Sequence, residues 1–254
     1  MGEVLIEENG GVLTITLNRP EKKNALTPDM YRVIADNIEA ADQDRAVRVI
    51  LIQANGDVFC AGNDIARFVA VNAAGYSGRP AGEPMLLALA GARKPVVAAV
   101  HGRAIGVGFT LLLHCDLVYV ADDALLSCPF VNLALTPEAA SSVLMPARIG
   151  HVRSFQLFAL GEPIDGRTAV EWGLANASLP AAEVRTRARA AALTLAGRPP
   201  AALAATKQLM RDGPALRQRI KEEFDVFYAQ LKSQEAREAL AAFSEKRPAD
   251  FSEF

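Results

Sequence analysis

The sequence is poor in the residues that mark several common classes of protein. Its 254 residues include three cysteines, three histidines and one tryptophan. Cys60, Cys115 and Cys128 follow no zinc-binding spacing, and an odd number of cysteines gives no framework of paired disulfides. The sequence therefore argues against a disulfide-stapled secreted domain and against a metal site. Reduced thiols in the cytoplasm are the expectation.

Long apolar runs and an excess of one charge are also absent. Lys and Arg total 27 against 29 Asp and Glu, a net charge of -2, which offers no broad basic surface for nucleic acid or an anionic membrane. Every apolar run stops well before the roughly 18 residues that a membrane-spanning helix needs. Residues 1–9 lack the pattern of a signal peptide, and Ser252-Glu253-Phe254 is no peroxisomal signal. We expect a cytoplasmic protein without nucleic-acid or membrane partners.

The sequence does contain an alternation of strand and helix patterns. Apolar strand patterns cover residues 12–17, 47–52, 95–100 and 116–120, and Thr27-Pro28-Asp29 is typical of a helix start. From Thr136 onward helical patterns dominate. After about Arg198 they become three charged segments, 203–210, 216–231 and 235–243. The pattern predicts an α/β core over residues 1–197, which holds the active site, and a helical region over 198–254.

Three polar connections between these elements stand out. Residues 17–26 join a strand to a helix and carry basic side chains that could face an anionic ligand. Residues 59–65 end a strand in Ala61-Gly62, where backbone N–H groups become available to a developing oxyanion. Residues 101–109 open a helix, and free N–H groups there attract negative charge. Each segment taken alone is more often an ordinary turn.

The third connection also contains Gly106-Val107-Gly108, a fragment of a dinucleotide-binding fingerprint. The third glycine of that fingerprint is missing, because Leu111 stands at its position. A lone Gly-x-Gly is weak evidence, so we reject a nucleotide cofactor and expect no cofactor of any kind.

Taken together and in this order, the three segments resemble the crotonase (enoyl-CoA hydratase/isomerase) superfamily along nearly the whole chain. The Asn-Arg-Pro…Asn-Ala-Leu opening, the Ala-Gly-Asn-Asp turn and the segment from Lys94 to Gly108 all match, as does Phe243-x-x-Lys246-Arg247. The resemblance implies an α/β spiral of strand–strand–helix units with a C-terminal helical trimerisation region. It implies an acyl-CoA substrate, with coenzyme A as part of the substrate, and a homotrimer or a dimer of trimers.

The resemblance also implies site residues. The backbone N–H groups of Ala61 and Val107 would hold the thioester oxygen, in agreement with their places at a strand end and a helix start. Asp64 would lie beside the coenzyme A path, and Lys22 and Lys23 would meet its phosphates. The remaining predicted contacts are Ala25, Gly62, Asn63, Ile65, Gly106, Phe130 and Leu135.

Two departures from the hydratase pattern narrow the choice of reaction. Typical hydratases have glutamates at the positions of Thr110 and Phe130, and neither residue here activates water as a carboxylate does. Glu138 remains, and Pro137-Glu138 with Ser141-Ser142 is similar to the monofunctional peroxisomal-type enoyl-CoA isomerases. There the matching glutamate is the single base, which moves a proton from the α to the γ carbon of a 3-enoyl-CoA in fatty-acid degradation.

Other interpretations stay open at the level of sequence. Thr136 could cap a helix, with Pro137 at its first position and Glu138 merely complementing its dipole. The protein could be a hydratase or catalyse another crotonase reaction. It could also be a non-catalytic acyl-CoA- or RNA-binding homologue, although its near-neutral charge argues against RNA. Residues 67–83 are poor in pattern, and we expect them to form a loop beside the acyl chain.

Overall fold

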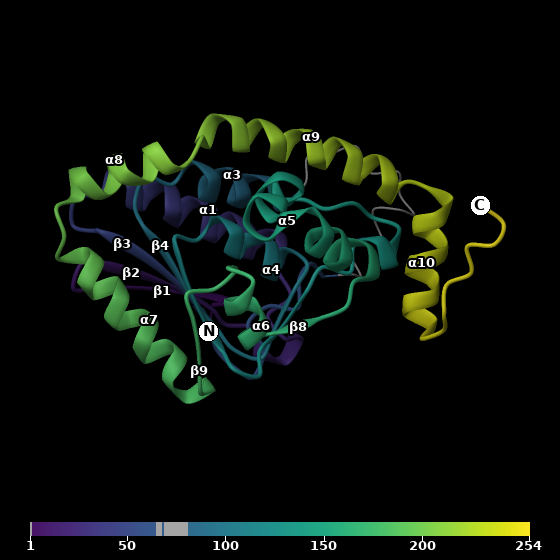
Figure 1. Cartoon of the computed structure of the whole chain (residues 1–254), viewed down its shortest axis with the longest axis horizontal. Coiled ribbons are helices and arrows are strands. Elements are labelled where there is room, and N and C mark those ends of the chain that lie inside the picture. The colour runs from purple at the N-terminus through teal and green to yellow at the C-terminus, as the bar shows by residue number, and fades with distance from the viewer. Residues whose placement is uncertain (1, 65–67, 69–80) are drawn as a thin grey trace.

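The computed structural model of the chain describes residues 2–64, 68 and 81–254, and it is built around a six-stranded sheet (Figure 1). The strand order is β1-β2-β3-β4-β6-β9. Only the β1–β2 hairpin is antiparallel, and the other neighbours run parallel. The strands are β1 (Val4–Asn9), β2 (Val12–Leu17), β3 (Val49–Ala54), β4 (Val96–Val100), β6 (Leu117–Ala121) and β9 (Ala177–Leu179).

A second, three-stranded sheet lies beyond the ends of β3, β4 and β6. It joins β5 (Arg103–Ile105), β7 (Leu125–Ser127) and β8 (Ile164–Asp165), with β5 and β7 parallel. The chain leaves β4 and β6 at the same edge, because parallel strands end together, and enters β5 and β7 after short turns. This second sheet carries the segment that opens the next helix, Val107–Thr110.

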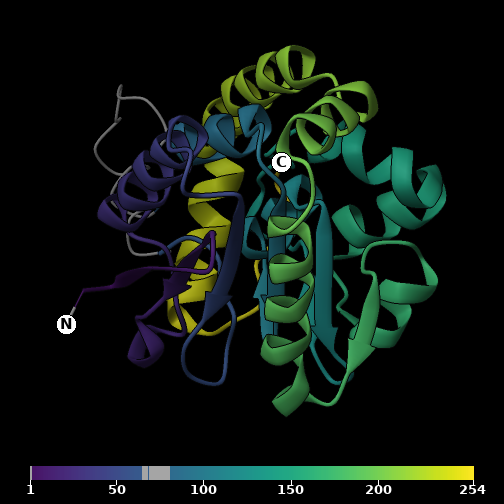
Figure 2. The same cartoon turned by 90° about the vertical axis from the view of Figure 1, so that its left-hand side faces the viewer.

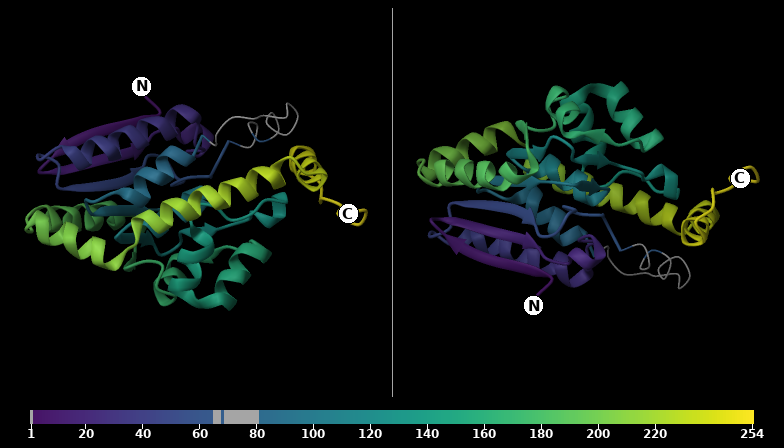
Figure 3. Two further views of the ribbon diagram at one scale, coloured as in Figure 1. Left: turned by 90° about the horizontal axis from the view of Figure 1, so that it is seen from above. Right: turned by 90° about the horizontal axis from the view of Figure 1, so that it is seen from below.

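Helices cover both faces of the main sheet. The helix α7 (Ala181–Ala196) packs against β3, β4 and β6 on one face, whereas α1 (Pro28–Gln43) and α3 (Glu83–Gly91) lie on the other (Figure 2). Seen from above, α9 runs along the top of the molecule to α10 at the far end (Figure 3). The longer helices are α1 (Pro28–Gln43), α3 (Glu83–Gly91), α5 (Ser141–Leu160), α7 (Ala181–Ala196), α8 (Pro200–Met210), α9 (Gly213–Leu231) and α10 (Gln234–Glu245), with the short α4 (Val107–Thr110) and α6 (Gly166–Glu171).

The core follows from two-sided burial of the parallel strands. Every residue of β2 and β4 is buried, as expected for strands that helices cover on both faces. The helix α1 adds one apolar stripe, with Ile34 and Ile38 buried, and Thr27 caps it by accepting a hydrogen bond from the Met30 N–H at 3.2 Å. Together they form one continuous hydrophobic core.

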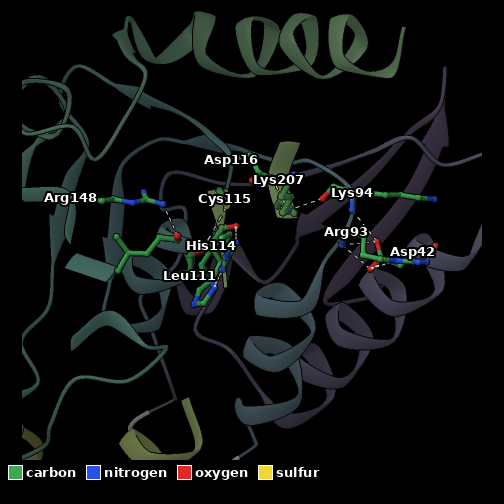
Figure 4. A network of polar contacts seen from close by, with 12 residues as sticks. Asp42, Arg93, Lys94, Leu111, His114, Cys115, Asp116, Arg148 and Lys207 are labelled. Carbon is green, nitrogen blue, oxygen red and sulfur yellow. Dashed lines mark hydrogen bonds and ion pairs between the residues drawn. The ribbon is translucent and has the colours of Figure 1, made fainter. Parts of the chain in front are cut away.

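A polar network fastens α8 to this core (Figure 4). Lys207 of α8 reaches the start of two strands, since its Nζ lies 2.7 Å from Asp116 Oδ2 and donates to the Lys94 carbonyl at 2.8 Å. The same Asp116 oxygen accepts from the Val96 N–H at 2.7 Å. The charged heads are thus satisfied by groups at the strand starts, which fixes α8 against the sheet.

The predicted α/β class is confirmed, and so are the C-terminal helices α8, α9 and α10 at nearly their predicted bounds. The hairpin strand β1 was not predicted. Its sequence Val4–Asn9 places three apolar residues before two glutamates and an asparagine, without the alternation that marks a half-buried strand. The predicted division at residue 198 falls between α7 and α8. The division into two domains stays a prediction.

Candidate active site

A cavity of about 790 Å³ opens beyond the ends of the parallel strands. Its walls come from the connection before α1, the turn after Phe59, the β5–α4 connection, residues 127–135 and the helices α9 and α10. Parallel sheets gather the ends of several strands at one edge, which is where such folds place their ligands. The three polar connections singled out in the sequence meet at this cavity.

A smaller cavity of about 30 Å³ adjoins the large one and contains Glu138 in its wall. Asn63, Phe68, Val107 and Phe227 line both cavities. The acidic side chain therefore lies at the inner end of a continuous site. Tyr31, Phe224 and Tyr228 complete an aromatic wall around it.

Two backbone N–H groups belong to residues that line both cavities. Cys60 and Ala104 pair in parallel, with the Ile105 N–H donating to the Cys60 carbonyl at 2.9 Å. Asn63 and Val107 follow this pair by three residues, each on its own segment. Within the part of the chain that the structure describes, neither the Asn63 N–H nor the Val107 N–H has a hydrogen-bond acceptor. The pair is therefore available to an oxygen in the cavity.

Two glycines allow the segments that carry Asn63 and Val107 to lie close together. Gly62 has φ of +93°, and a Cβ there would lie 2.9 Å from the Ile105 carbonyl oxygen. A Cβ on Gly108 would lie 2.7 Å from both the Cβ and the carbonyl oxygen of Cys60. Contacts this short with backbone atoms force the chain apart. The glycines thus set the separation of the two N–H groups.

The structure contradicts the assignment of Ala61 as an oxyanion donor. The Ala61 N–H already donates to the Lys23 carbonyl at 3.0 Å. Two residues later, the Asn63 N–H has no acceptor among the described residues. The Tyr31 hydroxyl holds the Asn63 side chain by donating to its Oδ1 at 2.7 Å. For Val107 the structure agrees with the predicted place at the start of a helix.

Glu138 lies in a loop before α5 and not in its first turn. The helix begins at Ser141, and the two residues between, Ala139 and Ala140, have φ of +67° and +53°. This left-handed conformation costs an alanine roughly 1–2 kcal/mol. The interpretation of Glu138 as a residue that complements the helix dipole is therefore wrong, because no helical turn exists there. Such strain is typical of functional sites.

Glu138 is 2% exposed, and its carboxylate accepts one hydrogen bond from the residues that the structure describes. The Thr110 hydroxyl donates to its Oε1 at 2.5 Å. Burial raises the pKa of Glu138 to about 8, which the Thr110 hydrogen bond opposes and the charge of Glu223 increases. The group thus binds its proton more tightly than an ordinary carboxyl, as suits a residue that takes up a proton and gives it back near neutral pH.

The strained turn is fixed by contacts from both sides. His114 contacts the Ala139 carbonyl through Nε2 at 2.7 Å, and Arg211 contacts His114 Nδ1. Because Arg211 can only donate, Nδ1 is the acceptor and Nε2 carries the proton. Burial lowers the pKa of His114 to about 3, so the ring is neutral. On the other side, the Ser142 N–H donates to Glu223 of α9 at 3.0 Å.

Most of the predicted contact residues line the large cavity. They are Lys22, Ala25, Gly62, Asn63, Asp64, Gly106, Phe130 and Leu135. Lys23 is different, because its side chain is exposed and does not line the cavity while its carbonyl binds Ala61. Ile65 lies outside the described residues, as does most of the predicted loop over 67–83.

Several cavity residues were missed from the sequence. Arg19 lines the cavity and forms ion pairs with Glu3 at 3.0 Å and Asp64 at 3.4 Å. Arg247, after α10, lines the opposite wall and is held by Glu238 at 2.5 Å. The site predicted for residues 1–197 thus extends into the C-terminal helices. The only sequence signal was the Lys246-Arg247 ending of the family pattern.

The rest of the chemistry of the described residues is limited. Residues 2–64, 68 and 81–254 contain no group of three metal-ligating side chains. No helix in these ranges combines the length and the apolar character of a membrane span. Cys60, next to the site, is buried and free, and burial raises the pKa of its thiol to about 12. A thiol with that proton affinity is not a nucleophile.

Comparison with known proteins gives one family. A family model described as enoyl-CoA hydratase/isomerase matches residues 7–253. Enoyl-CoA delta isomerase 2 of Rattus norvegicus is 31% identical over 96% of this chain, which spans 64% of the rat protein. A probable enoyl-CoA hydratase of Bacillus subtilis is 31% identical over 94% of this chain and 95% of its own length.

The fold agrees with a solved structure of the same kind. OdaA of Pseudomonas aeruginosa superposes with a TM-score of 0.90 at 44% identity, over 96% of this chain and 99% of that one. The predicted crotonase fold is confirmed by these comparisons. The chain therefore belongs to the crotonase (enoyl-CoA hydratase/isomerase) superfamily.

Proposed function

We propose that this crotonase is an enoyl-CoA isomerase that converts a 3-enoyl-CoA into the 2-trans-enoyl-CoA with Glu138 as its single base. The observation that carries the proposal is the meeting of Glu138 with two free backbone N–H groups at one small cavity. Glu138 is the one carboxylate in the wall of that cavity among the described residues.

The oxyanion is the first requirement of this chemistry. The thioester oxygen would accept hydrogen bonds from the Asn63 and Val107 N–H groups. Removal of a proton from C2 moves negative charge onto that oxygen, and two fixed donors stabilise it. Loss of one such donor costs about 3–4 kcal/mol in comparable sites.

Proton transfer is the second requirement. Ionised Glu138 takes the C2 proton, and the C–H electron pair enters a dienolate that extends from the thioester oxygen to C4. Glu138 then returns the same proton to C4, which leaves the double bond between C2 and C3. While the dienolate is present, Glu138 is protonated. Because its pKa is about 8, this protonated state is stable near neutral pH. Thr110 stabilises the ionised form through its hydroxyl.

Hydration of a 2-enoyl-CoA is the alternative function. Typical hydratases have acids at two positions that hold Thr110 and Phe130 here, and the surroundings of both residues argue against hydration. Phe130 is 6% exposed and packs against Phe158 with ring centroids 6.5 Å apart. Thr110 is fully buried and its hydroxyl is engaged by Glu138. An apolar wall with few polar groups does not hold an attacking water in place.

Coenzyme A would occupy the mouth of the large cavity, where three cations line the wall. Arg19 and Arg247 are held by carboxylates. Lys22 has no ion-pair partner within the described residues and its side chain is exposed. A free, flexible ammonium group is suited to an exposed phosphate. We assign Lys22 to the phosphates and do not assign Lys23.

The test compares two reactions in wild type and Glu138→Gln. Turnover of 3-trans-hexenoyl-CoA should be measured beside hydration of crotonyl-CoA. We expect isomerisation to exceed hydration in the wild type and to fall by about two or more orders of magnitude in Glu138→Gln. The exposed Glu162 provides the matched control, since Glu162→Gln should leave both rates unchanged. Hydration faster than isomerisation, or an active Glu138→Gln, would overturn the proposal.

A further inference from the structure

A second buried carboxylate, Glu223 of α9, lies behind the loop that carries Glu138. Its residue is 7% exposed, and its Oε2 has no hydrogen-bond partner among the described residues. Burial raises the pKa of Glu223 to about 7. Burying a carboxyl with an unsatisfied oxygen is unfavourable, so a role beyond packing is needed to explain it.

Glu223 supplies a cap that the sequence before α5 does not provide. The N-cap position of this helix is Ala140, whose side chain accepts no hydrogen bond. The first N–H groups of a helix need acceptors from elsewhere. Glu223 Oε1 accepts from the Ser142 N–H at 3.0 Å, and its charge lies at the positive end of the helix. The helix start is therefore capped from α9.

The unsatisfied polar atoms in this region gather around the same turn. Four buried side-chain atoms of the described residues have no partner: Thr136 Oγ1, Ser141 Oγ, Arg211 Nε and Glu223 Oε2. Thr136 and Ser141 belong to the turn itself. Glu223 contacts the turn from α9, and Arg211 contacts it through His114. This concentration indicates that the turn is held by a few specific contacts and not by a full set of hydrogen bonds.

The charges near Glu138 identify Glu223 as its electrostatic neighbour. The charge of Glu223 raises the proton affinity of Glu138, and Arg219 on its own helix partly offsets the charge of Glu223. Among the described residues, the other titratable groups around Glu138 are the thiol of Cys128 and the phenols of Tyr31 and Tyr228. Glu223 lines neither cavity, so it does not reach the substrate.

We propose that Glu223 is a positioning residue, which caps α5 in place of the missing N-cap side chain and holds the turn that aims Glu138 into the cavity. As a like charge it also disfavours ionisation of Glu138. Docking of α9 thereby sets both the place and the protonation of the base. The choice of substrate in the test below rests on the proposed isomerase function.

The kinetic test uses Glu223→Gln, Glu223→Ala and the control Asp225→Asn, an exposed residue of the same helix. Glu223→Gln keeps an acceptor for Ser142 but removes the charge. We expect the midpoint of its kcat/KM pH profile to move to lower pH, with kcat at high pH within about threefold of wild type. Glu223→Ala loses the acceptor, and kcat should fall about tenfold or more with little change in KM. Asp225→Asn should match wild type.

A stability measurement tests the same proposal without any substrate. Thermal unfolding of wild type, Glu138→Gln, Glu223→Gln and the double variant at pH 5 and pH 9 forms a double-mutant cycle. At pH 9 both carboxylates are ionised, so we expect Glu223→Gln to raise Tm more when Glu138 is present than when it is glutamine. At pH 5 both are protonated, and the two effects should add.

The outcomes separate this proposal from the proposed function. Additive effects at both pH values, together with an unshifted pH profile for Glu223→Gln, would overturn the positioning role. A wild type without activity on 3-trans-hexenoyl-CoA would overturn the isomerase function, while the stability cycle would still decide the role of Glu223. If Glu223→Ala does not fold, Glu223→Gln and the cycle carry the decision.

Discussion

Asn63 and Val107 present backbone N–H groups on two segments that the Cys60–Ala104 bridge joins, whereas Glu138 presents a side chain on a strained loop that distant residues hold in place. The backbone half of the site, Asn63 and Val107, contributes no reacting side chain. Its geometry is fixed by glycines and by the pairing of Cys60 with Ala104. The second half uses a single carboxylate. Its geometry depends on contacts from α8 and α9.

The difference indicates where each half tolerates change. Backbone donors are insensitive to the identity of the side chain that they carry, but sensitive to anything that shifts the chain by a fraction of an ångström. A side-chain base has the opposite dependence, since its own identity and its environment decide its proton affinity. Four experiments test this contrast.

The largest effect is expected from Gly108→Ala. This substitution should displace the backbone N–H donors, while Glu138 itself stays unchanged. The new Cβ would meet two atoms of Cys60 at 2.7 Å, and the chain at Val107 must move to relieve the contact. We expect kcat to fall by about two to three orders of magnitude, the cost of losing one oxyanion donor. Steady-state kinetics with 3-trans-hexenoyl-CoA measures the loss. A circular dichroism melt of the same variant shows whether the fold is retained, and a fully active Gly108→Ala would contradict the close-packed register.

The next effect is a pH dependence that belongs to the side-chain half. The base must be ionised to take a proton, and the pKa of Glu138 is about 8. We therefore expect kcat/KM to rise about tenfold per pH unit below that value and to level off above it, a change of about a hundredfold between pH 6 and the plateau. A profile that is flat from pH 6 to pH 9 would show that a different group limits the reaction.

A smaller effect is expected from Thr110→Val, which removes the hydrogen bond to Glu138 but keeps the shape of the side chain. The Thr110 hydroxyl lowers the pKa of Glu138, so its loss should move the pH profile to higher pH. At pH 7 we expect kcat/KM to fall about tenfold, the size of one hydrogen bond to a charged group, and the deficit should narrow above pH 9. Thr110→Ser retains the hydroxyl and serves as the control.

The smallest effect is expected from Val107→Ala, which changes the side chain of a backbone donor. Val107 is 1% exposed, so the cavity left behind should lower the free energy of unfolding by about 2 kcal/mol. Because the N–H group is unchanged, kcat should stay within about threefold of wild type. Urea denaturation and steady-state kinetics on one preparation provide both values. A loss of activity as large as that of Gly108→Ala would remove the distinction between the two halves.

The two halves also differ in how much of them the sequence predicts. The helix start at Val107 follows from the glycines and the apolar residues after a buried strand, and the structure places it as predicted. The partner donor was placed two residues early, at Ala61. Nothing local to that segment indicates that the Lys23 carbonyl accepts the Ala61 N–H. A long-range contact therefore decided which of two similar groups is free.

Glu138 shows the limit more clearly. Its local sequence, with Thr136, Pro137 and an acid, predicts a helix start there, whereas the helix begins at Ser141. The reason is that the cap comes from Glu223, 81 residues beyond Ser142, and that two alanines adopt the left-handed conformation. Only the resemblance to the isomerases singled out this residue. The strands and helices, by contrast, follow from local periodicity and were largely predicted.

The contribution of α9 and α10 to the cavity walls has a consequence for the order of events during synthesis. The sheet and both of its helical faces are complete once residue 196 has been made, and such a core can begin to fold while the chain is still growing. Phe227, Phe243 and Arg247, which line the cavity, are then still to come. A nascent chain therefore acquires its framework first and its substrate site last, so premature release after α7 yields a sheet protein that cannot enclose an acyl-CoA.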